Sequence, residues 1–455
     1  MTAATPFEVI DTFRVKEYLC HRLQFRLPLV YATGNAHGGD TIAVVCQVVQ
    51  KYNDSDDFAI GDNAKLVCYL QGGPGGSCAP FSGGGYVKVL VDKGYTVVLM
   101  DQRGTGWSTP IEPATLLARA GADADAQLRY LLNFRADSIV DDAERIRQAL
   151  IGADPWTLLG QSYGGFCSFT YLSKYPQSVT ASLITGGVPP IGFTADDVYA
   201  ATYARTAERN RHYYRKYPQD AARVHRICRY LASHDVAVPN GGRLSVERFQ
   251  QLGIRFGASG GTDAVHHVVA KFAHDLEVLG HPTYESLLSV QNSVSFDTSV
   301  LYALFQENIY SDGAGDAQSP RWAAHRARPA SFVYSPDQDH VQFTGEMVYP
   351  FMYDDYAELR PLKAVAERLM AYDDYSPLYD VATLRATSVP IVAATYVYDQ
   401  YVDFDLTRKV KETVFGGNGN LKQYVTSEFF HNGIGANPEK VIGTLLQLLK
   451  QGEVD

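Results

Sequence analysis

Short apolar runs alternating with amphipathic stretches dominate the first part of the chain. Runs at residues 65–70, 96–100 and 156–159 have the length and β-branched or aromatic character of buried strands. Between the second and the third, apolar residues recur at helical spacing over residues 139–150, with charged residues on the opposite face. Strand, helix, strand in this order predicts a mostly parallel α/β sheet flanked by helices.

Two β-rich runs precede these strands, at residues 25–31 and 41–49. The intervening residues 34–40 are rich in glycine and other turn formers. This pattern predicts an antiparallel hairpin at one edge of the sheet.

The composition and the apolar periodicity of the chain change near residue 190 and change back near residue 378. The intervening segment is charged, rich in tyrosine and helical in periodicity, with candidate helices at 196–217, 264–279 and 362–372. Afterwards come two more predicted strands and a closing helix, at 390–395, 421–426 and 438–450, and a strand at 181–185 precedes the change. The simplest interpretation is an α/β core, residues 1–189 and 379–455, interrupted by a mainly helical insertion, residues 190–378.

Composition agrees with a globular protein that has more than one structural unit. The 455 residues exceed what one core usually holds, and 46% are hydrophobic and 20% charged. A formal net charge of −10 without a cluster of Lys and Arg argues against nucleic-acid binding. The six cysteines lack metal-site spacing and disulfide density, and no signal or transmembrane pattern is present. We therefore expect a cytoplasmic protein without a membrane partner; nothing in the pattern decides its oligomeric state.

A serine stands between two glycines where a predicted strand meets a predicted helix, in Gly160-Gln-Ser-Tyr-Gly164. Glycines two residues before and after the serine let strand and helix approach, and a sharp turn exposes the hydroxyl. In a chain with 39 glycines the motif alone can arise by chance. Its context, with a helix over 166–175 that ends before Pro176, favours Ser162 as a nucleophile.

A serine hydroxyl needs a base to take its proton and an acid to orient that base. In α/β hydrolases these partners follow late strands, in the order acid and then histidine. The last histidine, His431, lies in a turn-rich loop after the final predicted strand. Asp399 lies nearest the end of the strand before it, and Asp403 and Asp405 are alternatives that are also suited to capping a helix.

A glycine-rich loop, Leu70-Gln-Gly-Gly-Pro-Gly-Gly-Ser77, follows an early strand. Such a loop supplies one amide of an oxyanion hole, and the residue after the nucleophile supplies the other. Gly73 and Tyr163 are the predicted donors. A phosphate cradle is not expected, because the loop lacks a Gly-Lys-Ser/Thr ending. The next motif, Asp101-Gln-Arg-Gly-Thr-Gly-Trp-Ser108, is expected to brace the loops.

Together these motifs resemble the prolyl iminopeptidase (proline aminopeptidase) family of α/β-hydrolase serine peptidases. The resemblance covers residues 65–190 and 390–435 and includes Asp399 and His431-Asn-Gly433. One departure is Gln71, where family members often carry histidine. The resemblance implies an α/β-hydrolase fold in which residues 190–378 form a helical cap.

In that family, carboxylates of the cap bind the free α-amino group of the substrate. A partly desolvated ammonium requires a charge-assisted partner, and this requirement restricts cleavage to the first residue. Glu307, in Gln306-Glu-Asn-Ile-Tyr310, resembles the family's Glu-Asn motif, and Glu346 is a second candidate. Either can instead be an ordinary helix carboxylate. Cap aromatic residues such as Tyr310 and Phe351 are candidates for an apolar proline pocket, although most are expected to serve packing.

The resemblance thus implies a serine exopeptidase that releases N-terminal proline from peptides with a free N-terminus. Neither a metal nor a cofactor is expected, and adjacent His266 and His267 point to different faces of a predicted helix. The same machinery also suits an esterase or an aminopeptidase of broader specificity. A hydrolase-fold protein that only binds ligands is the alternative from another class.

Overall fold

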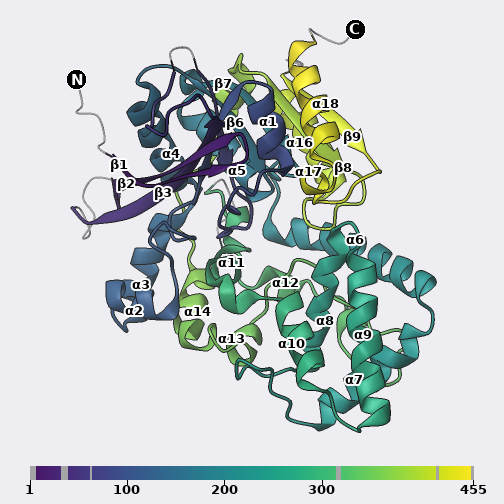
Figure 1. Ribbon diagram of the computed structural model, residues 1–455. Coiled ribbons are helices and arrows are strands. Elements are labelled where there is room, and N and C mark those ends of the chain that lie inside the picture. Colours follow the sequence, from purple (N-terminus) through teal and green to yellow (C-terminus); the bar gives the residue numbers. More distant parts are fainter. Residues whose placement is uncertain (1–6, 32–38, 62–63, 314–318, 417–419, 452–455) are drawn as a thin grey trace.

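The computed structural model describes residues 7–31, 39–61, 64–313, 319–416 and 420–451. Within these residues a nine-stranded sheet has the order β1-β2-β3-β5-β4-β6-β7-β8-β9 (Figure 1). Its strands are β1 (Phe7–Val15), β2 (Tyr18–Pro28), β3 (Thr41–Lys51), β4 (Lys65–Leu70), β5 (Tyr95–Met100), β6 (Trp156–Gln161), β7 (Val179–Thr185), β8 (Ile391–Tyr396) and β9 (Leu421–Thr426).

The parallel part of the sheet confirms the predicted fold class. Strands β5, β4, β6, β7, β8 and β9 pair in parallel, and they contain the strands predicted from the apolar runs. Apart from β9, the other edge strand, these strands are mostly buried, as helices on both sides of a sheet require.

The predicted hairpin forms as β2 and β3, but its position at the sheet edge was wrong. Strand β1 pairs antiparallel with β2 and is itself the edge strand. The residues of β1 are mostly exposed and lack an apolar run, so backbone pairing rather than burial orders them. The predicted turn over 34–40 falls mostly outside the described residues.

Helices cover both faces of the sheet, each over its own apolar core. On one face lie α4 and α5, with α15 and α16 beside them; α1 and α18 pack together on the other. The helices of this part are α1 (Gly85–Asp92), α2 (Pro113–Ala120), α3 (Ala124–Leu131), α4 (Ala136–Ile151), α5 (Tyr163–Lys174), α15 (Val381–Ala386), α16 (Phe404–Phe415), α17 (Gly433–Ala436) and α18 (Pro438–Lys450).

The chain between β7 and β8 adds no strand to the sheet and forms a helical body at one end of it (Figure 1). Its helices are α6 (Ala195–Lys216), α7 (Asp220–Ser233), α8 (Val246–Gln250), α9 (Gly261–Val278), α10 (Tyr284–Ser293), α11 (Val300–Phe305), α12 (Ala323–Arg326), α13 (Met352–Asp355) and α14 (Lys363–Ala371), with a 3-10 segment η3 (Gln251–Gly257). The helices predicted there correspond to α6, α9 and α14. No helix in the described part of the chain is long and apolar enough to cross a membrane.

Candidate active site

The turn between β6 and α5 holds Ser162 in a strained conformation. Its φ of 55° and ψ of −126° are rare for a residue with a side chain. A Cβ on Gly164 would lie 1.8 Å from the Leu70 carbonyl oxygen, and one on Gly165 would lie 2.1 Å from that of Gly187. Only glycine therefore permits this approach of helix to strand, as a nucleophile elbow requires.

His431 and Asp399 form a buried pair. The distance from His431 Nδ1 to Asp399 Oδ2 is 2.7 Å. The other carboxylate oxygen, Oδ1, accepts the amides of Tyr401 and Val402 at 2.8 and 3.1 Å. Because the carboxylate occupies Nδ1, the imidazole keeps Nε2 for proton transfer.

The alternative acids serve other purposes. Asp403 is the N-cap of α16, where its Oδ1 accepts the amides of Asp405 and Leu406 at 2.9 and 3.1 Å. Asp405 is in the first turn of the same helix. The structure thus places only Asp399, of the three carboxylates, on the imidazole of His431.

The environment of His431 raises its pKa. Burial alone disfavours the imidazolium, but the charge and hydrogen bond of Asp399, together with the charge of Glu346, outweigh burial. The histidine is therefore a stronger base than an ordinary buried imidazole, and the imidazolium that forms during proton transfer is stabilised.

Ser162 and His431 both lie against the turn that follows β7. A Cβ on Gly187 would lie 2.3 Å from the Ser162 carbonyl oxygen, and one on Gly186 would lie 3.1 Å from His431 Nδ1. The amide of Ser162 donates to the Thr185 oxygen at 3.0 Å. The carboxyl ends of the parallel strands thus gather the serine, the imidazole and the carboxylate at one edge of the sheet.

The glycine-rich loop after β4 runs beside the elbow. A Cβ on Gly72 would lie 2.9 Å from the Cβ of Ser162, so the loop backbone passes directly over the serine. Gly73 has a φ of 118°, which favours glycine. Tyr163 is the first residue of α5, so its amide has no partner within the helix. These are the positions where the sequence predicts oxyanion donors.

Gln71, the departure from the family pattern, holds this loop in place. Its Oε1 accepts the Tyr69 hydroxyl and the Gly72 amide, each at 2.8 Å. Its Nε2 donates to the Ser77 oxygen at 2.9 Å. The glutamine side chain therefore closes the loop on itself beside the serine.

The Asp101–Ser108 motif also braces the site. Arg103 and Asp142 form a fully buried bidentate pair with distances of 2.6 and 2.7 Å. Asp101 accepts the amides of Cys78 and Trp107 at 2.8 and 2.9 Å. The remaining guanidinium donors reach the carbonyl oxygens of Leu29, Asn133 and Pro28. This motif connects the core strands to the loops, as the sequence indicated.

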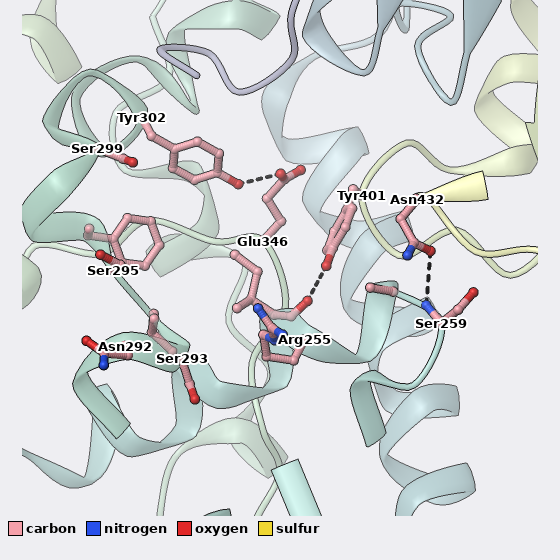
Figure 2. Close-up of a pocket in the computed structure, with 14 residues that line it drawn as sticks. Arg255, Ser259, Asn292, Ser293, Ser295, Ser299, Tyr302, Glu346, Tyr401 and Asn432 are labelled. Carbon is pink, nitrogen blue, oxygen red and sulfur yellow. Dashed lines mark hydrogen bonds between the residues drawn. The ribbon is translucent and has the colours of Figure 1, made fainter. Parts of the chain in front are cut away.

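Glu346 faces a cavity of about 620 Å³ between the helical body and the core (Figure 2). The hydroxyl of Tyr302 donates to its carboxylate, and the positive charge of His431 acts on it. Burial raises the pKa of Glu346 to about 7, against the opposing effect of His431 and the Tyr302 hydrogen bond. The cavity is lined by Ile254, Arg255, Ala258, Ser259, Asn292, Ser293, Val294, Ser295, Phe296, Ser299, Tyr302, Glu346, Tyr401 and Asn432.

Glu307 lies in a different environment. It is fully buried, and its two oxygens accept the amides of Ala323 and Ala324 at the start of α12, at 2.8 and 2.9 Å. Burial raises its pKa to about 8, although the amides favour the charged form. Glu307 does not line the cavity. The structure thus brings Glu346 to the histidine and holds Glu307 inside the helical body.

The residues that connect the helical body to the loops carrying Asp399 and His431 were not predicted from the sequence. The ring of Tyr401 packs edge-on against His431, with centroids 4.7 Å apart, and its hydroxyl donates to the Ile254 oxygen. Gln400 Nε2 donates to the Gly253 oxygen at 2.9 Å, and the His431 amide donates to that of Gly257 at 3.1 Å. The chain has 30 tyrosines, so no local signal distinguishes Tyr401.

The aromatic candidates and the paired histidines have structural partners. Tyr310 packs against Phe166 and Tyr199, and Phe351 stacks on Tyr349. His266 Nδ1 lies 2.7 Å from Asp220 Oδ2. In the described part of the chain, no group of three or more His, Cys, Asp or Glu residues is arranged to hold a metal ion.

A parallel sheet with a serine elbow and a histidine–aspartate pair at its strand ends defines an α/β hydrolase with serine-hydrolase geometry. The family described as alpha/beta hydrolase fold matches residues 65–269. The chain belongs to the proline iminopeptidase family. It is 42% identical over 393 residues to the proline iminopeptidase of Aeromonas sobria, covering 86% of this chain and 88% of that protein. It is 37% identical over 400 residues to proline iminopeptidase aneH of Aspergillus aculeatus, covering 86% of each.

Proposed function

We propose that this protein is a serine aminopeptidase that releases N-terminal proline from peptides. The observation that carries the proposal is the similarity to two proline iminopeptidases over 86% of the chain. The geometry of the elbow, the His431–Asp399 pair and the cavity beside them supports the same reaction. Residues 190–378 act as a cap over a core formed by residues 1–189 and 379–455.

Catalysis proceeds by acyl transfer. Ser162 Oγ attacks the carbonyl of the first residue while His431 Nε2 takes its proton, and Asp399 stabilises the imidazolium. The amides of Gly73 and Tyr163 bind the oxyanion. His431 then gives its proton to the leaving amine, and a water molecule, activated by the same imidazole, hydrolyses the prolyl ester and restores the serine.

Glu346 binds the amine of the substrate in this mechanism. Its carboxylate faces the cavity and interacts electrostatically with His431, so an ammonium bound there lies near the reacting carbonyl. If a further residue precedes the bound one, the nitrogen at this position is an amide and carries no charge to pair with the carboxylate. This restricts cleavage to the first residue. Glu307 is the second candidate, and its burial behind the cavity lining makes it the weaker one.

Peptides with a free N-terminus are the proposed partners, and the cytoplasm is the proposed compartment. All six cysteines are unpaired, and five of them are buried. Free thiols in this number suit a reducing environment.

The test compares amide and ester substrates in the wild type and in Ser162→Ala. The wild type should hydrolyse proline arylamide faster than alanine or leucine arylamide and faster than short acyl esters. Ser162→Ala should lose at least about a thousandfold in kcat, because the nucleophile and its proton transfer act as one unit. A fluorophosphonate should label the wild type only.

The rivals give different results in the same assays. Ester hydrolysis that exceeds every amide would identify an esterase. Equal rates on all arylamides would identify an aminopeptidase of broader specificity. A folded wild type that neither labels nor hydrolyses any substrate would identify a binding protein.

A further inference from the structure

The cavity beside the histidine holds two residues of opposite charge. Among the described residues that line it, Glu346 is the only acid and Arg255 the only base (Figure 2). The rest of its polar lining is neutral and consists of hydroxyl and amide side chains, namely Ser259, Asn292, Ser293, Ser295, Ser299, Tyr302, Tyr401 and Asn432. A ligand that carries both charges therefore has one preferred orientation.

Arg255 is available to a ligand. Its guanidinium makes no hydrogen bond or ion pair with another side chain in the part of the chain that the structure describes, and the residue is exposed. Many other arginines are paired; Arg248, seven residues before it on α8, contacts Asp297 at 3.3 Å. An unpaired guanidinium on a cavity wall has all its donors free for a carboxylate.

The backbone around Arg255 is hydrogen-bonded to the loop that carries Asp399. The preceding carbonyl, of Ile254, accepts the hydroxyl of Tyr401 and the Gln400 side chain. The Arg255 oxygen accepts the Ala258 amide at 3.1 Å, and a Cβ on Gly261 would lie 1.6 Å from that oxygen. The backbone of Arg255 therefore has a defined position relative to Asp399 and His431.

The overall charge makes this single cation important. The chain carries a formal net charge of −10, so its long-range field repels anionic ligands. A guanidinium on the cavity wall offsets this repulsion locally and can bind a carboxylate through parallel hydrogen bonds. Glu346, on the same cavity, repels a carboxylate and attracts an ammonium.

We propose that Arg255 binds a carboxylate on the leaving side of the substrate, and that this carboxylate is the C-terminus of a short peptide. The proposal rests on the proposed function, in which Glu346 binds the amine. A peptide residue extends by at most about 3.6 Å, so a cavity of this size accommodates a few residues. The protein is then a peptidase of short peptides such as Pro-Gly and Pro-Gly-Gly.

The test measures kcat/KM for Pro-Gly, Pro-Gly-Gly and Pro-Gly-Gly-Gly, each as free acid and as C-terminal amide. Every value is divided by that of the same variant on proline arylamide. The wild type should prefer the acid about fivefold at one of the shorter lengths, because a single partly exposed charge pair contributes about this much. The ratio of kcat/KM for the acid to that for the amide should fall toward one as salt is added.

Variants identify the group responsible. Arg255→Gln should bring the ratio of acid to amide to about one, and Arg255→Lys should retain part of the preference because it keeps the charge but not the planar fork. Arg211→Gln is the matched control: Arg211 is an exposed arginine of the same helical body that does not line the cavity, and its loss should leave the ratio unchanged.

A second arm separates the two sources of a carboxylate. It compares Pro-Asp-Gly-amide with Pro-Asn-Gly-amide, which differ in an acidic side chain alone. A preference confined to this arm overturns the C-terminal assignment. So does an acid-to-amide ratio near one in the wild type at every length, or a ratio that survives Arg255→Gln. Absence of any hydrolysis, including that of proline arylamide, instead overturns the proposed function.

Discussion

Two glutamates of the helical body differ in what surrounds them, although the sequence offers both for the same role. Glu346 faces the cavity and carries a pKa raised to about 7 by burial. Glu307 is enclosed and accepts two backbone amides. Both environments disfavour a charged carboxylate, but only that of Glu346 leaves room for an ammonium to neutralise it.

Glu346→Gln should raise KM for proline arylamide by about tenfold or more, the size of a lost hydrogen bond to a charged group. It should also move the acid limb of the kcat/KM profile to lower pH. The reason is that the Glu346 charge raises the pKa of His431, so its removal lets the imidazole stay neutral, and act as a base, in more acidic solution.

Glu307→Gln is the comparison for this profile. Glu307 is not among the groups that shift the pKa of His431, so the acid limb should stay in place. Kinetics from pH 5 to 9, on the same substrate, measure both variants. An acid limb that stays unchanged in Glu346→Gln, or that moves to higher pH, would contradict the assignment of Glu346 as a neighbour of the base.

At the scale of elements, the elbow depends on how closely α5 approaches the ends of β4 and β7. The local sequence shows this element clearly, because the glycines that permit the approach lie within six residues of each other. It shows β1 poorly, because a mostly exposed edge strand has no apolar run to reveal it. Backbone pairing with β2, the next strand along the chain, orders that strand.

Gly164→Ala should destabilise the protein by about 3 kcal/mol or more, since the added methyl would lie 1.8 Å from the Leu70 oxygen and backbone must move. Fluorophosphonate labelling should fall with it, because the elbow is displaced. Gly443→Ala in α18 is the control: nothing lies within 4 Å of its added Cβ. That change should stabilise the helix by about 0.5–1 kcal/mol. Chemical unfolding measures both, and equal stabilities for the two variants would disprove the packing argument.

At the scale of the whole molecule, the helical body and the core share the catalytic loops. Segment η3 accepts hydrogen bonds from Gln400, Tyr401 and the amide of His431. In addition, α11 packs on the glycine-rich loop after β4, where a Cβ on Gly75 would lie 2.6 Å from that of Leu301. A movement of the helical body would therefore displace both His431 and the glycine-rich loop after β4.

Tyr401→Phe should loosen this connection without removing the ring that packs on His431. We expect a loss of about 1 kcal/mol in stability, because Gln400 still donates to the Ile254 oxygen. Amide hydrogen exchange should rise over residues 251–257, and kcat/KM should fall severalfold. Tyr398→Phe is the control, on the same loop but 44% exposed. Unchanged exchange in Tyr401→Phe would show that the helical body is held by other contacts.

By itself, the sequence determined the parts of this protein that depend on neighbours along the chain. These are the parallel strands, the helices on their faces, the elbow at Ser162 and the order of aspartate and histidine after the late strands. Each follows from a local cause, namely apolar periodicity, glycine at a close approach, or a carboxylate placed directly after a strand.

Only the tertiary structure decided which distant groups meet. It placed Asp399 rather than Asp403 on the histidine, and Glu346 rather than Glu307 on the cavity. It also placed Arg255, whose charge is opposite to that of Glu346, on the same cavity. The physical reason is that burial and electrostatic partners depend on which elements fold together across hundreds of residues. No periodicity or motif within one segment carries that information.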